Sequence, residues 1–82
     1  MNEEFINIIS TLSVIKEDDS VPKNVRSKID NAINCLNNDS KEVCLKVDEI
    51  LEELDEISND PNLPNYTRVE ILNIIGLLGG FQ

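Results

Sequence analysis

The chain has 82 residues, 40% of them hydrophobic, and its 16 acidic and 7 basic side chains give a net charge of −9. That length predicts one domain with a modest core, and the negative charge disfavours binding to nucleic acid or anionic membranes. The sequence has no histidine, the commonest general base and metal ligand, so we expect neither an enzyme nor a protein that needs a metal or another cofactor.

The N-terminal sequence MNEEFINIIS carries acids where a signal peptide carries bases. The chain also lacks an apolar run of the roughly 18 residues that a membrane helix needs. We therefore expect a cytoplasmic protein. Cys35 and Cys44 are then reduced thiols, and a disulfide across the intervening turn or a redox-sensing role are the alternatives.

Apolar residues recur at helical spacing in four segments, and no segment alternates with the period of a strand. We predict helices over about 2–17, 22–37, 41–58 and 64–79. Their inward faces are, in chain order, Phe5, Ile8, Ile9, Leu12, Ile15; Val25, Ile29, Ala32, Ile33, Leu36; Val43, Val47, Ile50, Leu51, Leu54, Ile57; and Ile71, Ile74, Ile75, Leu78.

The residues between these segments suit helix ends. Pro22 and Pro64 fit a first helical position, where a missing N–H costs nothing. Asp39 or Ser40 can cap the third helix, and Gly79-Gly80 fits a left-handed C-terminal cap. Asp60-Pro61-Asn62 suits a β-turn with proline in its second place.

The two halves of the chain match when one is shifted by 42 residues. Ile8, Leu12, Ile15, Asp18, Pro22, Arg26, Ile29, Asn31, Ile33 and Leu36 then meet identical residues at Ile50, Leu54, Ile57, Asp60, Pro64, Arg68, Ile71, Asn73, Ile75 and Leu78. Repeats of this length built from two helices resemble HEAT repeats. Two repeats are too few for an open solenoid. We therefore expect an all-α, four-helix up-down bundle over residues 1–82, made of duplicated helical hairpins at about 5–36 and 47–78.

The motif D-x3-P-x3-R occurs once in each half, as Asp18, Pro22, Arg26 and as Asp60, Pro64, Arg68. We interpret it as a structural turn in which the arginine reaches back to an acid or to the carbonyls that end the preceding helix. Two copies of a binding site is the alternative.

The segments VPKNVRSKIDNAI and EILEELDEISNDPNLPNYTRVEILNII resemble a small archaeal family, uncharacterised protein family 0147, and the resemblance spans about residues 5–78. It implies an all-helical, archaeal, cytosolic protein. The family has no assigned activity, so the resemblance implies no functional residue.

Two charged clusters remain. Glu49, Glu52, Glu53 and Glu56 share one helix face, which we interpret as a solvated surface, with a divalent-cation site as the alternative. Lys23, Arg26 and Lys28 form a basic cluster that we expect to pair with nearby acids, and weak association with RNA or the ribosome is its alternative.

We expect a non-catalytic module for protein–protein interaction or assembly. After the core of the fourth helix is assigned, Val69, Leu72 and Leu77 remain, with Gly76 beside them and Phe81 on the tail. Their counterparts in the first half are mostly polar, so the fourth helix has an apolar face to bury. We expect a homodimer through this face, in addition to an unidentified protein partner. The alternative is an irregular bundle in which the first or third helix covers these residues.

Overall fold

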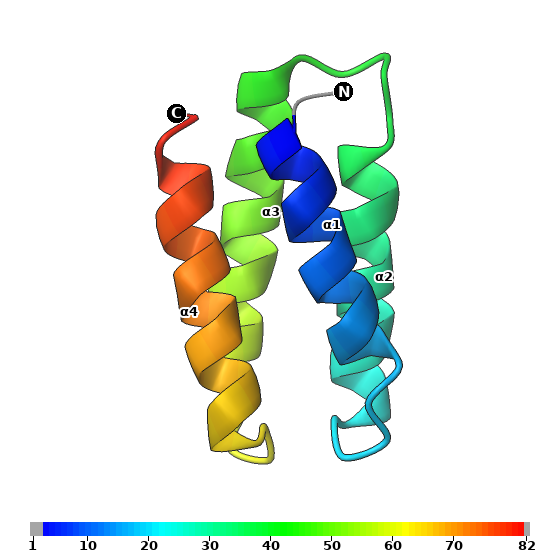
Figure 1. Cartoon of the computed structure of the whole chain (residues 1–82), viewed down its shortest axis with the longest axis vertical. Coiled ribbons are helices and arrows are strands. Elements are labelled where there is room, and N and C mark those ends of the chain that lie inside the picture. Colours follow the sequence, from blue (N-terminus) through cyan, green and yellow to red (C-terminus); the bar gives the residue numbers. More distant parts are fainter. Residues whose placement is uncertain (1–2, 82) are drawn as a thin grey trace.

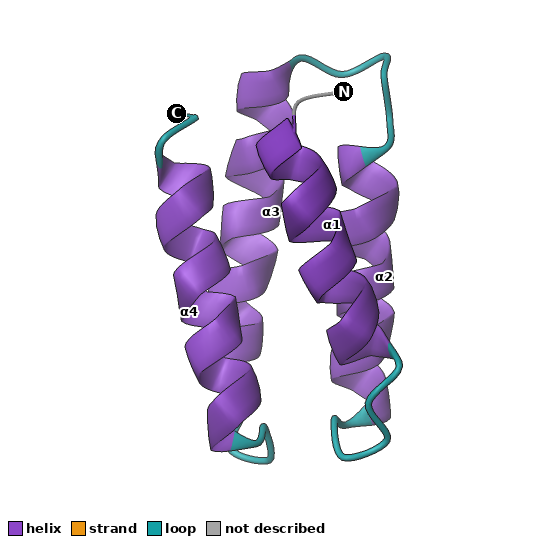
Figure 2. Ribbon diagram, in the orientation of Figure 1, coloured by secondary structure: helices purple, strands orange, loops and turns teal. Residues whose placement is uncertain are grey.

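The computed structural model describes residues 3–81 as four helices, with no strand in that range. The helices are α1 Glu3–Lys16, α2 Lys23–Leu36, α3 Val43–Ser58 and α4 Asn65–Gly79. They run alternately down and up a bundle of 32 × 19 × 18 Å (Figures 1 and 2). The predicted all-α, four-helix bundle is confirmed.

The helices pack as two hairpins. α1 packs chiefly on α2 and α3 chiefly on α4, and α2 also lies against α3. Contact between α1 and α4 is the sparsest of the four neighbouring pairs. The bundle therefore has one loosely packed seam, between its first and last helices (Figure 1).

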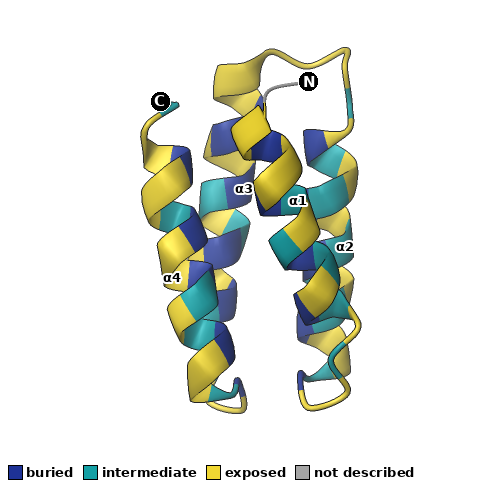
Figure 3. Ribbon diagram, in the orientation of Figure 1, coloured by how far each residue is buried: buried dark blue, intermediate teal, exposed yellow. Residues whose placement is uncertain are grey.

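The buried positions explain why the hairpins resemble each other. In the first half they are Phe5, Ile8, Leu12, Ile15, Val21, Val25, Ile29, Ala32 and Leu36. In the second half they are Val47, Ile50, Leu54, Ile57, Leu63, Thr67, Ile71, Ile74 and Leu78, each of them 42 residues after its counterpart, and Lys46 is buried in addition. The inward sides of all four helices meet in this core (Figure 3).

Three joints of one design connect the helices, at residues 17–22, 37–42 and 59–64. In each, a side-chain oxygen of Asp18, Asn38 or Asp60 accepts the N–H two residues further on, at 2.8, 3.1 and 2.8 Å. The carbonyl of the same residue accepts the N–H three residues further on. The turn that the sequence shows twice is therefore used three times, with asparagine in the middle copy.

The helix ends differ from the sequence-based expectations in several places. Pro22 and Pro64 lie one residue before their helices, in extended backbone with ψ near 144° and 143°, and not at the first helical position. Ser40 bonds to Asn38 and caps nothing; Glu42 precedes α3 and makes no side-chain capping bond.

Gly79 and Gly80 are not left-handed. α4 ends at Gly79 and the residue that follows it, Gly80, has φ −69°. The N–H groups of Gly80 and Phe81 bond to carbonyls three residues back. This tight last turn carries Phe81 onto Phe5, with ring centroids 4.8 Å apart. Phe81 is therefore half-buried and does not extend the apolar surface of α4, whereas Val43, assigned to the core from periodicity, is 47% exposed.

Candidate functional site

The outward face of α4 carries large apolar side chains in contact with solvent. Val69 is 65% exposed, Leu72 52% and Leu77 49%. Gly76 lies one helical turn from Leu72, and a Cβ added to it would meet no atom within 4 Å. We call Val69, Leu72, Gly76 and Leu77 the α4 face. The other described helices leave these three apolar side chains about half exposed or more, so the alternative that the first or third helix covers them is wrong.

The α4 face is electrically neutral, unlike the rest of the molecule. Arg68 and Glu70 are the only charged residues of α4. By contrast, α3 carries one cation, Lys46, and the acids Asp48, Glu49, Glu52, Glu53, Asp55 and Glu56. α4 thus combines several exposed apolar side chains with few charges.

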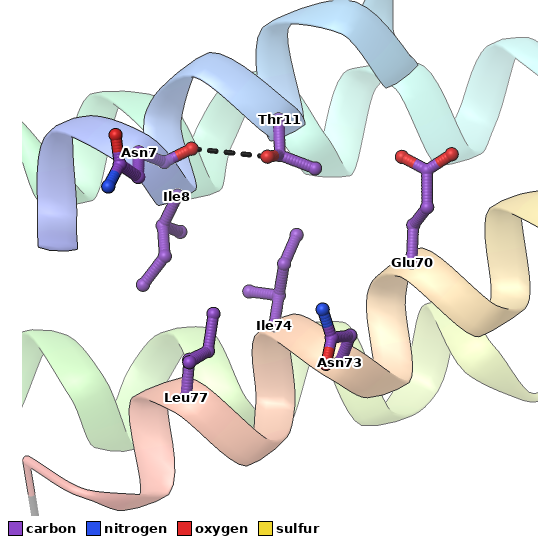
Figure 4. A pocket seen from close by; sticks show the side chains of 7 residues that line it. All are labelled: Asn7, Ile8, Thr11, Glu70, Asn73, Ile74 and Leu77. Carbon is purple, nitrogen blue, oxygen red and sulfur yellow. Dashed lines mark hydrogen bonds between the residues drawn. The ribbon is translucent and has the colours of Figure 1, made fainter.

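A small groove borders this face along the α1–α4 seam. Asn7, Ile8 and Thr11 from α1 face Glu70, Asn73, Ile74 and Leu77 from α4, with the Thr11 hydroxyl donating to the Asn7 carbonyl at 3.1 Å (Figure 4). Its volume is about 90 Å³. Small-molecule sites usually have roughly 300 Å³ or more, so this groove suits one inserted side chain better than a cofactor.

A wider and polar pocket of about 260 Å³ opens at the first joint. Lys16 at the end of α1 and Lys23, Arg26, Ser27 and Asp30 on α2 line it, and we call these residues the basic pocket. Lys16 is bonded to Asp30 at 2.7 Å, and this partnership raises the pKa of the Lys16 ammonium. Within the described chain, the Lys23 side chain makes no ion pair or hydrogen bond.

The motif arginines occupy equivalent positions but are held differently. Arg68 donates to the carbonyls of Ser58 and Asp60 at 2.9 and 2.8 Å and to the side chain of Asn65 at 2.9 Å. Arg26 makes only an ion pair of 3.8 Å with the fully exposed Asp19. Its buried Nε–H has no hydrogen-bond partner.

Asp18 takes part in one contact that the sequence did not suggest. The Tyr66 hydroxyl, at the start of α4, donates to the Asp18 carboxylate at 2.6 Å across the seam. This bond, together with the Ser20 N–H, lowers the pKa of Asp18, and the carboxylate raises the pKa of Tyr66. The pairing depends on the side-by-side placement of the two joints, for which the local sequence has no signal.

The acidic face of α3 is a solvated surface with partial pairing. Glu49, Glu52, Glu53 and Glu56 line an open depression. Lys41 bonds to Glu49 at 2.8 Å and Lys28 reaches Glu56 at 3.4 Å. Burial raises the pKa of Glu53. Residues 3–81 contain no cluster of three or more potential ligands arranged to hold a metal ion.

Both cysteines are free thiols, and they contact different groups. Cys35 donates to Glu49 at 3.3 Å, and burial followed by this carboxylate raises its pKa. The Cys44 thiol faces the Phe81 carbonyl at 4.0 Å.

None of the described helices is long and apolar enough to cross a membrane.

Comparison with known proteins matches this chain to a single protein family. Residues 1–80 match the uncharacterised protein family UPF0147. A UPF0147 protein of Methanothermobacter thermautotrophicus is 36% identical over 77 residues, which cover 94% of this chain and 76% of that protein. A UPF0147 protein of Pyrococcus furiosus is 40% identical over 78 residues, which cover 93% and 84%.

A solved structure agrees with the fold. The crystal structure of a protein of unknown function, MMP1188, is 40% identical and superposes with a TM-score of 0.88, covering 94% of this chain and 88% of that one. The resemblance seen in the proline motifs is thus confirmed over nearly the whole chain.

Proposed function

Because the chain belongs to the uncharacterised protein family UPF0147, a membership that brings no assigned activity, we propose its function from its surface: a non-catalytic assembly module that pairs with a second copy of itself through the α4 face. The observation that carries the proposal is the exposure of three large apolar side chains, Val69, Leu72 and Leu77, on one helix. Exposed apolar surface tends to mark contacts in soluble proteins.

The charge distribution supports a second copy as the occupant. Two chains of net charge −9 repel each other over most of their surfaces. α4 is the helix on which charge is balanced by one arginine and one glutamate. A two-fold pair of α4 helices therefore brings the apolar faces together and keeps the acidic α3 helices apart.

Gly76 adds a second argument for close helix contact. Glycine inside a helix costs about 1 kcal/mol relative to alanine, and space for a Cβ is open at this position. The fold of the single chain therefore does not require glycine here. A neighbouring helix that approaches closely at Gly76 supplies a reason for it.

We also propose that the module works in the cytoplasm. Cys35 and Cys44 are both unpaired thiols, one half-buried and one exposed, which is the state that a reducing compartment maintains.

Sedimentation equilibrium at micromolar concentration tests the pairing. We expect a dimer, and we expect Leu72→Glu to weaken it by tenfold or more, since it places two like charges in an apolar contact (about 1.4 kcal/mol per tenfold). Ile6→Glu is the matched control, because Ile6 is 49% exposed on α1 and the change in charge is the same. A monomeric wild type, or equal effects of the two variants, would contradict the proposal.

A further inference from the structure

The basic pocket on the first hairpin overlaps the position that Val69 and Leu72 of the α4 face occupy on the second. Lys16, Lys23, Arg26, Ser27 and Asp30 stand 42 residues before Ser58, Asn65, Arg68, Val69 and Leu72. In the second half these positions carry one cation among neutral residues, and in the first half they carry three cations and one carboxylate. Only the arginine is common to both.

The different neighbours explain why Arg26 is not bonded like Arg68. Asn65 offers Arg68 a side-chain acceptor at 2.9 Å. Its counterpart, Lys23, is a cation that can accept no hydrogen bond and repels a guanidinium. The Ser58 carbonyl, the last of α3, accepts from Arg68 Nε at 2.9 Å, whereas Arg26 Nε leaves the equivalent carbonyl of Lys16 unused.

Arg26 and Lys23 are therefore uncommitted cations that border one pocket. Lys23 has no partner among the described residues. Arg26 makes one distant pair with the exposed Asp19, and its charge also helps to lower the pKa of Asp18. The side chain of Arg26 is 33% exposed, so the outer nitrogens of its guanidinium can reach a ligand although Nε cannot. Ser27 adds a hydroxyl to the same wall.

We propose that the basic pocket binds a phosphate group, as the free dianion or as a phosphate monoester. A guanidinium presents paired donors that match two oxygens of a phosphate, and an ammonium acts beside it as a point charge. Both kinds of donor are uncommitted here, and the pocket of about 260 Å³ has room for such an anion. The surrounding negative charge favours a small anion over a long polyanion, because a small anion is held within reach of the pocket's cations.

The chain offers a direct spectroscopic test, because Arg26 and Arg68 are its only arginines. Their Nε–H groups give two signals in a ¹H–¹⁵N spectrum, and Arg26→Lys assigns them by removing one. Inorganic phosphate, added against sodium chloride at constant ionic strength, should shift the Arg26 signal saturably. The Arg68 signal, held by the Ser58 carbonyl, should stay in place.

Lys23→Asn is the decisive variant, since it gives Arg26 the neighbour that Arg68 has. It should lower phosphate affinity about tenfold or more, as expected for loss of one charge-assisted contact. Lys28→Asn is the control: it removes the same charge from α2, but Lys28 pairs with Glu56 and does not line the pocket.

Three outcomes would overturn the proposal. The first is an Arg26 signal that moves no more with phosphate than with chloride. The second is equal loss of affinity in the two lysine variants, which would indicate general attraction to a basic helix. The third is binding of an RNA oligonucleotide that lacks terminal phosphate when inorganic phosphate does not bind, which would assign the pocket to a phosphodiester backbone.

Discussion

One cation stands four residues after the residue that precedes α2, α3 and α4, and its bonding differs in each case. Arg68 makes three hydrogen bonds, two of them to carbonyls of the joint before it. Lys46, buried with 6% of its surface exposed, donates to the carbonyl of Leu36 at 3.3 Å, the last residue of α2. Arg26 reaches no such carbonyl. Identical residues in matching positions therefore need not contribute equally to stability.

Replacing Arg68 with alanine should lower the free energy of unfolding by on the order of 1 kcal/mol, because two carbonyls lose a charged donor. Arg26→Ala should lower it less, since its buried Nε–H satisfies no acceptor. Urea unfolding followed by circular dichroism measures both changes. Equal losses would show that these hydrogen bonds are not what distinguishes the two arginines.

At the scale of the helices, periodicity was enough to predict their number, their order and most of their inward residues, although Val43 proved to be exposed. Ile8, Leu12, Ile29 and Ile71 lie at the spacing of a buried helix stripe, and all four are buried. The ends were less predictable because the joints satisfy their own polar groups. Asn38 accepts both the N–H and the hydroxyl of Ser40, so the serine that looks like a helix cap is already engaged.

Gly76→Ala should act in opposite directions on the single chain and on the pair. Alanine should stabilise α4 by about 1 kcal/mol, because its Cβ enters open space, yet it should weaken the dimer by separating the two helices. Urea unfolding at low concentration and sedimentation equilibrium measure the two effects. Asn34→Ala, at the matching position of α2, is the control and should change stability without changing association. A dimer unaffected by Gly76→Ala would remove the argument for close helix contact.

At the scale of the whole molecule, the two hairpins meet loosely along the α1–α4 seam, where a hydrogen bond from Tyr66 to Asp18 connects them. The sequence predicted the apolar face of α4 because Val69 and Leu72 were left over once the core was assigned. It did not predict this bond or the weak bonding of Arg26. The Tyr66–Asp18 bond joins residues far apart in the chain and so has no local signal. The presence of Lys23 where the second half has Asn65 was a local signal for the difference between the two arginines.

The Tyr66–Asp18 bond makes stability depend on pH at both extremes. The pKa of Asp18 is lowered from 3.8, so its contribution is complete above 3.8 and is lost as pH falls through the lower folded value. The pKa of Tyr66 is raised from 10.0, so its contribution is present below 10.0 and is lost as pH rises through the higher folded value.

Tyr66→Phe should therefore destabilise the protein at neutral pH and make no difference in strong acid or strong base. Urea unfolding of wild type and variant across the pH range measures the difference. A gap in stability that stays constant from acid to base would show that the carboxylate–phenol pair does not connect the hairpins.

The contact of Phe5 with Phe81 brings the two ends of the described chain together at one end of the bundle, beside the joint that links α2 to α3. The start of α1 and the end of α4 thus lie at the same end of the bundle as the joint between α2 and α3. The packing of the two hairpins therefore does not require the first hairpin to precede the second in the chain. A circular permutant opened at residues 38–41 and joined near Phe81 and Phe5 would have the second hairpin before the first in its sequence. We expect it to form the same core.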